Sequence, residues 1–524
     1  PALQIIILGS GGGPLENNTT AILVRAVASG WQKCSMVAVD AGVHLAAIVQ
    51  ILESTQPPDL ASLPLPHTLE AGPFAGLQLH SASTHVNAAH IARSLVDTYL
   101  ITHPHLDHIA GFVVNTAGVP GGPRPKRLAG LPATIEAFKQ HIFNNVIWPN
   151  LSDENGGVGL VTYTRLVDGG SSAIGDGDAR GYLEVAEGLS VKACSISHGS
   201  PIEPPPPPAQ RGSLSSTPAH TFPRSTHNPS ATPQTRVASC PYIFQQPPNL
   251  LDAQPPPPPA PAGPVYDSTV YFLRDSATGC EILAFGDVEP DALSSVPRNL
   301  GIWTEAAPKF ARGALRAILL ECSYDDSQST DRLFGHMKPS FVMEELRTLA
   351  REVDMVRCLS NAESAKRKRL QVDCDAAVSA RRKTGPEFTS DAGEARGFDS
   401  EAVSPKTVRS RFNSQQDDAV ALQEQARSGT GTPYLSAPTA ELSLKDVVAR
   451  DIRLPLPFYD GVDRAESTAV RPLEGLKVII IHVKNKLDGV DQGATIMKEL
   501  QAHEEEAQTG VEFILSYAGQ SIYV

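Results

Sequence analysis

The hexapeptide from His103 to His108 places three imidazoles and one carboxylate within six positions. It reads His-Pro-His-Leu-Asp-His and lies between two apolar runs. Neutral imidazole and carboxylate are the usual zinc donors outside thiolate sites, and three protein ligands with one open position define a catalytic zinc. Because side chains alternate in an extended loop, His103 and His105 would point the same way and share one metal ion. Asp107 and His108 would then face a second ion.

Two metal ions close together can clamp the attacking and leaving oxygens of a phosphoryl group and hold a bridging hydroxide. One hexapeptide provides too few ligands for two ions, so this hypothesis requires further ligands after later strands. His198, Asp287 and His482 meet the requirement, because each follows an apolar run directly or within two residues. Asp40 and Glu321 follow runs of their own. Since packed strands are buried, we expect one active-site rim built from loops at a sheet edge.

Ten short apolar runs predict the strands that would carry these residues. The runs alternate with helical stretches, which is the pattern of a layered domain of sheets and helices. The predicted strands are Leu3–Leu8, Ala21–Val27, Met36–Val39, Thr98–Ile101, Val191–Ser197, Thr269–Arg274, Ile282–Phe285, Ala317–Leu320, Val478–Ile481 and Glu512–Leu515.

The 524 residues exceed what one hydrophobic core usually serves, so we expect two domains or large insertions. The sequence favours insertions. Residues 201–263 hold two polyproline tracts and are predicted to be a disordered, proline-rich insertion. Residues 361–440 lack a sustained apolar period and are predicted to be a second, low-complexity insertion. The expected core therefore consists of three parts: residues 1–200, 264–360 and 441–524.

Composition limits the partners and the compartment. A formal charge of −13 argues against a general nucleic-acid binder, because clustered Lys and Arg supply most affinity for phosphate backbones. Seven scattered cysteines without a CxxC pair favour reduced thiols in a cytoplasmic protein. We expect no signal peptide and no membrane partner, since no run approaches the roughly 20 apolar residues that cross a bilayer. Basic runs at 366–369 and 381–383 leave a nuclear location open.

The order of these motifs resembles the metallo-β-lactamase superfamily, whose pattern is HxHxDH followed by a histidine, an aspartate and a final histidine. The resemblance implies an α/β fold, a four-layer αββα sandwich, here with two long insertions. It also implies two Zn²⁺ ions, or another divalent metal, and a supporting role for Asp40 beside the metal-binding loop. The implied ligands to the first ion are His103, His105 and His198. Those to the second ion are Asp107, His108 and His482, and Asp287 is the implied ligand to both ions.

Further segments resemble the fungal and bacterial class II 3′,5′-cyclic-nucleotide phosphodiesterases. The matching segments are 8–14, 103–111, 318–324, 333–337 and 480–484. The resemblance implies hydrolysis of cyclic AMP, or of cyclic GMP, to the 5′-nucleotide by a metal-bridging hydroxide. Within these segments His336 is our candidate general acid, with Glu321 orienting it, and Asp287 is both catalytic and metal-binding. The residues that contact the nucleobase are not identified.

Two alternatives stay open. Another di-zinc hydrolase of the same fold, such as an RNA 3′-end nuclease, a sulfatase or a thioester hydrolase, would use the same ligands, although the acidic charge disfavours the nuclease. A non-catalytic scaffold whose insertions recruit partners is the second alternative, and the complete ligand set speaks against it. A homodimer also stays open.

Overall fold

The computed structural model describes residues 1–118, 124–199, 266–383 and 471–524, with side chains up to residue 368 in the third range. The predicted insertion 201–263 and residues 384–440 lie outside the described residues, as do residues 441–470 of the predicted core. Within the described ranges, no helix has the length and apolar character needed to cross a membrane.

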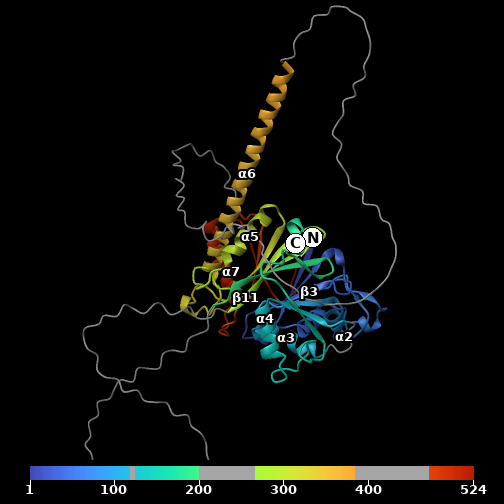
Figure 1. The fold of residues 1–524 in the computed structure, drawn as a ribbon. Helices are drawn as coiled ribbons and strands as arrows, with labels where there is room; N and C mark the ends of the chain where they lie inside the picture. The colour runs from blue at the N-terminus through green and yellow to red at the C-terminus, as the bar shows by residue number, and fades with distance from the viewer. Residues whose placement is uncertain (119–123, 200–265, 384–470) are drawn as a thin grey trace, which may run out of the picture. The chain divides into compact units, whose positions relative to one another are not determined.

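Two seven-stranded sheets form the centre of the fold (Figure 1). The first sheet has the order β16 (Ser521–Tyr523), β1 (Leu3–Gly9), β2 (Ala21–Ala26), β3 (Met36–Ala41), β6 (Val96–Leu100), β7 (Lys126–Gly130) and β8 (Val161–Arg165). The second has the order β15 (Glu512–Leu515), β14 (Lys477–Ile481), β13 (Leu315–Glu321), β12 (Glu281–Phe285), β11 (Asp267–Asp275), β10 (Leu189–Ser197) and β9 (Leu183–Ala186). A small separate pair consists of β4 (His67–Thr68) and β5 (Gln78–Leu79).

Helices cover the outer face of each sheet. The α-helices are α1 (Leu45–Thr55), α2 (Thr84–His90), α3 (Leu106–Thr116), α4 (Pro132–Ala137), α5 (Asn299–Ala311), α6 (Pro339–Lys383) and α7 (Gln492–Ala507). Short 3₁₀ turns lie at Glu16–Asn18, Val27–Ser29, Leu60–Ser62, Gly177–Ala179 and Thr330–Arg332, and π turns at Ile91–Leu95 and Phe138–Ile142.

Alternation along the strands divides the core into three apolar layers. In β1, Ile5 and Ile7 face the other sheet, whereas Ile6 and Leu8 face the layer that contains α1 and α3. In β13, Leu319 belongs to the layer between the sheets and Leu320 to the layer under α5, α6 and α7. Strands buried on both faces read as continuous apolar runs, which is why the sequence showed them clearly. The result is the predicted αββα sandwich.

Each of the ten predicted strands corresponds to a strand of the two sheets: β1, β2, β3, β6 and β10 to β15. The sequence missed β7, β8, β9 and β16, together with the pair β4 and β5. These segments are short, and most lie at or near a sheet edge, where polar residues interrupt the apolar pattern. Lys-Arg-Leu-Ala-Gly in β7 is an example.

The first residues of the second predicted insertion are helical. Residues 361–383 continue α6. The apolar period ends near Val356 because residues 359–368 are exposed, so no packed face is required of them. Ala, Glu, Lys and Arg between residues 361 and 368 have high helix propensity, which favours the helix although these residues are exposed. The predicted boundaries between core and insertions remain predictions.

Candidate metal centre

The His103–His108 loop connects β6 with α3. Strand β6 ends at Leu100, and the backbone N–H of Ile101 still donates to Ala129 of the neighbouring strand. The chain then turns into α3, where the N–H of His108 donates to the carbonyl of His105. The extended part carries His103 and His105, and the first helical turn carries Asp107 and His108. The sequence therefore places four donors at the carboxyl end of a buried parallel strand.

The second sheet supplies the remaining predicted ligands from the same kind of position. His198 follows β10, Asp287 follows β12 by two residues and His482 follows β14. Strands β12 and β14 are parallel to β13, and β10 has the same direction because both β10 and β12 pair antiparallel with β11. All three strands therefore end at one edge of the sheet, and the three side chains meet there.

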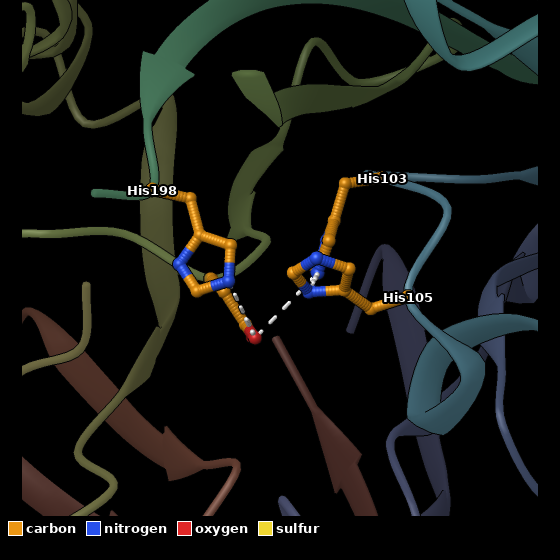
Figure 2. Close-up of side chains that lie close together, drawn as sticks. His103, His105 and His198 are labelled. Carbon is orange, nitrogen blue, oxygen red and sulfur yellow. Dashed lines mark hydrogen bonds and ion pairs between the residues drawn. The ribbon is translucent and has the colours of Figure 1, made fainter. Parts of the chain in front are cut away.

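The Asp287 carboxylate lies between two groups of histidines. Its Oδ2 is 3.6 Å from Nε2 of His103 and 3.6 Å from Nε2 of His198. Its Oδ1 is 3.2 Å from Nε2 of His108 and 3.3 Å from Nε2 of His482. Figure 2 shows the side chains of His103, His105 and His198 pointing toward a common place. One carboxylate with an oxygen toward each group is suited to bridge two cations.

The seven predicted metal ligands thus form two overlapping groups. Donor atoms within each group lie within 4.8 Å of one another. The groups share Asp287 and consist of His103, His105, His198 and Asp287, and of Asp107, His108, Asp287 and His482.

Hydrogen bonds from Asp40 and Thr102 orient two of these rings. Asp40 accepts from the backbone N–H and the hydroxyl of Thr102, both at 2.8 Å, and from Nδ1–H of His108 at 2.8 Å. Because the Thr102 hydroxyl donates to Asp40, it accepts from Nδ1–H of His103 at 3.0 Å. Both rings therefore present an unprotonated Nε2 to the centre when neutral. Outer partners of this kind set the tautomer of metal-binding histidines.

Asp40 has a φ of 55°, which is unusual for a residue with a side chain. Strain of this kind persists where the surroundings enforce it, often at functional sites. Here the buried contacts with Thr102 and His108 enforce it. The geometry supports the role predicted for Asp40, which contacts the loop and belongs to neither ligand group.

The second sheet orients its histidines in the same way. The hydroxyl of Ser323 donates to Oε2 of Glu321 at 2.6 Å and accepts from Nδ1–H of His482 at 3.0 Å. The carbonyl of Gly335 accepts from Nδ1–H of His198 at 2.9 Å. Thr102, Ser323 and the Gly335 carbonyl were missed at the sequence level. Thr102 and Ser323 lie one and two positions from predicted site residues, which is the signal that could have found them.

These residues fit a divalent cation. Burial lowers the pKa of His103 far below its ordinary value and that of His198 to about 4, so both rings are neutral, as metal binding requires. Nε2 of His103 lies 3.0 Å from Nδ1 of His105, so the two ring nitrogens face a common space. Buried Nε2 of His108 makes no hydrogen bond within the described residues.

Charge in the centre is also consistent with a cation. Burial acts to raise the pKa of Asp287, but the surrounding histidines hold it well below its ordinary value, so the carboxylate is ionised. Burial acts to lower the pKa of His108, but Asp287 and Asp40 raise it well above its ordinary value. Two carboxylates therefore demand positive charge at this ring, which a proton or a metal ion can supply.

His336 and Glu321 form a buried pair beside Asp287. Nδ1 of His336 lies 3.1 Å from both oxygens of Glu321 and 3.8 Å from Oδ2 of Asp287. Burial, followed by the charge of Asp287, raises the pKa of Glu321 to about 7, and burial lowers the pKa of His336 to about 4. A carboxyl group that titrates near neutrality beside an imidazole can hold one proton for the pair. Glu321 and His336 also form a metal-capable trio with His198.

A glycine-rich loop closes the centre against His482. The backbone N–H of Gly12 donates to Val483 at 3.0 Å, and a Cβ on Gly12 would lie 2.4 Å from the His482 ring. Nζ of Lys484 donates to the Gly12 carbonyl at 3.0 Å. Its charge contributes to the lowered pKa values of His105 and His336, although burial is the largest cause of both. Lys484 therefore places a positive charge near the centre.

The fold and the site define a protein of the metallo-β-lactamase type, with two packed sheets and a histidine and aspartate centre at one edge. Comparison with known proteins points to one family. Residues 31–168 and 260–368 match the family described as cAMP phosphodiesterases class-II.

Individual proteins are similar to the chain over about two thirds of its length. The chain is 28% identical over 383 residues to a 3′,5′-cyclic-nucleotide phosphodiesterase of Candida albicans, covering 67% of this chain and 83% of the relative. It is 26% identical over 339 residues to a 3′,5′-cyclic-nucleotide phosphodiesterase of Schizosaccharomyces pombe, covering 65% of this chain and 72% of the relative. The crystal structure of unliganded yeast PDE1 has the same fold, with a TM-score of 0.57, 18% identity and coverage of 100% of this chain and 99% of that chain.

Proposed function

We propose that the chain is a metal-dependent 3′,5′-cyclic-nucleotide phosphodiesterase that converts cyclic AMP or cyclic GMP to the 5′-nucleotide. The observation that carries the proposal is the Asp287 carboxylate, with two histidine Nε2 atoms near each oxygen. The family match and the names of the relatives supply the substrate class.

We assign two divalent ions, Zn²⁺ in our proposal, to the two groups that share Asp287. Nitrogen and carboxylate donors without thiolates suit zinc with an open position. Zinc held there would supply an activated water at neutral pH and positive charge for the phosphoryl oxygens. The proposed ligands are His103, His105 and His198 for one ion, Asp107, His108 and His482 for the other, and Asp287 for both.

The protein's own side chains orient the centre and move the proton. Asp40, Thr102 and Ser323 hold the rings so that each Nε2 faces Asp287. Hydrolysis to the 5′-nucleotide breaks the bond between phosphorus and the 3′-oxygen, which leaves as a hydroxyl after gaining a proton. In our proposal His336 donates this proton, and Glu321 accepts Nδ1–H of the ring and stabilises its positive charge. General acid catalysis of this kind contributes typically 10²–10⁴-fold.

The test combines metal analysis with three substrates. The purified chain should contain close to two divalent ions and hydrolyse cyclic AMP, cyclic GMP or both faster than a generic aryl phosphodiester. An active sample without metal would overturn the metal assignment. Hydrolysis of the aryl diester without either cyclic nucleotide would favour another hydrolase of this fold, and a metal-free, inactive sample would favour the scaffold alternative.

We also propose a cytoplasmic location. The five cysteines whose side chains the structure describes form no disulfide with one another, which supports a reducing compartment; they are Cys34, Cys194, Cys280, Cys322 and Cys358. Partners for the insertions and a homodimer remain predictions.

A further inference from the structure

A cavity of ≈ 660 Å³ lies at the opposite edge of the second sheet from the metal centre. Its lining includes Cys280, Ala314 and Lys477, which precede or begin the strands β12, β13 and β14. Asp287, Glu321 and His482 lie at the other ends of the same strands. At about 3.3 Å per residue, a strand of the length of β13 separates the two places by roughly 20 Å. The cavity is therefore not part of the proposed active site.

The charge of the cavity lining is unusual for this chain. Four lining side chains are cationic and one is a carboxylate, although the whole chain has a formal charge of −13. The cations are Arg274, Arg312, Arg316 and Lys477, and the carboxylate is Asp178. The lining therefore attracts anions, although the net charge of the chain repels them.

Only two of the four cations have an acidic partner in the part of the chain that the structure describes. Arg274 pairs with buried Glu281 at 2.7 Å, and Arg312 pairs with Asp178 at 3.2 Å. Arg316 and Lys477 make no ion pair among the described residues. Burial raises the pKa of the Cys280 thiol in the lining, and the charge of Arg316 partly opposes this effect. The cavity thus keeps two positive charges available for a ligand.

We propose that this cavity binds a small phosphorylated molecule, with Arg316 and Lys477 as the principal phosphate contacts. The planar guanidinium group of Arg presents a fork of donors that matches phosphate oxygens, and Lys supplies a compact point charge. The volume lies within the roughly 300–1,000 Å³ that is usual for small-molecule sites. The lining also includes Ala314, whose apolar side chain can contact a nucleoside. A free phosphate and a nucleoside monophosphate share this recognition chemistry.

Calorimetric titration of the full chain tests the proposal. The Asp287→Ala variant is used so that the metal centre does not compete for the ligand, and the probes are 5′-AMP, inorganic phosphate and adenosine. We expect 5′-AMP to bind and adenosine not to bind. Binding of inorganic phosphate with equal affinity would identify the phosphate group as the whole ligand, whereas tighter binding of 5′-AMP would identify a nucleotide.

Charge reversal then locates the site. Adding Arg316→Glu and Lys477→Glu should weaken the binding of 5′-AMP by about tenfold or more, because both changes replace an attractive charge by a repulsive one. A tenfold loss of affinity corresponds to about 1.4 kcal/mol of binding free energy. Arg347→Glu with Arg351→Glu, on the exposed face of α6, changes the net charge equally and should leave the affinity unchanged.

Two results would overturn the proposal. One is the absence of anion binding to the Asp287→Ala chain, and the other is unchanged affinity after reversal of Arg316 and Lys477. Neutral replacements, Arg316→Gln with Lys477→Gln, keep the test valid if the reversed variant does not fold, as judged by circular dichroism. Because the proposal does not depend on the phosphodiesterase activity, failure of either idea leaves the other standing.

Discussion

The two ends of the strands β12, β13 and β14 differ in how their polar groups are satisfied. At the carboxyl ends, Asp287, Glu321 and His482 are at most 2% exposed. They form ion pairs or hydrogen bonds with one another or with nearby side chains. At the amino ends, Arg316 and Lys477 border a cavity and make no ion pair within the described residues. Buried polar groups must be paired, because an unpaired one costs about 1–3 kcal/mol. The carboxyl ends are therefore preorganised, whereas the amino ends retain charge for a ligand.

Removal of Asp287 should break the preorganised end most severely. Asp287→Ala leaves four buried histidines without their shared carboxylate, so we expect loss of metal and of nearly all activity. The loss of metal affinity should exceed the roughly 10–100-fold typical of an outer hydrogen-bond partner. Metal analysis of the purified variant measures the loss of metal, and turnover of cyclic AMP measures the loss of activity.

Asp291 provides the matched control. It lies on the same loop, and its carboxylate accepts from the backbone N–H groups of Asn299 and Leu300 at the start of α5. Asp291→Ala should lower stability by about 1 kcal/mol, as for a lost helix cap, and should retain metal. Equal metal loss in both variants would contradict the bridging role of Asp287.

The second prediction separates proton transfer from metal binding at the same end. His336→Ala should lower kcat by roughly 10²–10⁴-fold with metal content unchanged, because the ring belongs to the proton-holding pair rather than to either group around Asp287. The measurement is turnover of cyclic AMP beside metal content. Since His336 also lies in a metal-capable trio with His198 and Glu321, loss of metal would assign it as a ligand instead.

The third prediction concerns the hydrogen bonds that orient the rings. Asp40→Asn replaces a carboxylate that accepts from Thr102 and His108 by an amide of similar size. We expect metal affinity to fall by about 10–100-fold while the fold is kept. Competition with a chelator measures the affinity, and restoration of activity by excess Zn²⁺ would distinguish weakened binding from a damaged catalytic step. No change in affinity would refute the supporting role.

The smallest effect should come from the opposite end of the strands. Arg316→Glu with Lys477→Glu should leave metal content and kcat for cyclic AMP unchanged, because these residues make no contact with the metal centre. The variant Arg347→Glu with Arg351→Glu controls for the change in net charge. If kcat fell only in the variant Arg316→Glu with Lys477→Glu, the two ends of the strands would be coupled rather than independent.

Particular residues show how much of the fold and of the metal centre the sequence could predict. The strands β12, β13 and β14 were predicted because strands buried on both faces are continuous apolar runs. Residues that directly follow such runs, including His198 and His482, could be placed at a sheet edge. Thr102 and Ser323 were missed because a hydroxyl beside a ligand has no distinctive spacing. The continuation of α6 was missed because an exposed helix needs no apolar period.

The sequence by itself determined the donor types, the local HxHxDH spacing and the strands that carry the ligands, because these depend on chain neighbours and on hydrophobic periodicity. Only the tertiary structure brought His482 to 3.2 Å from Asp107, across 375 positions, and set the pKa values of Glu321 and His336. It also created the cationic cavity from residues far apart in the chain. These features depend on which strands pair and in which direction, and long-range packing of the two sheets decides that pairing.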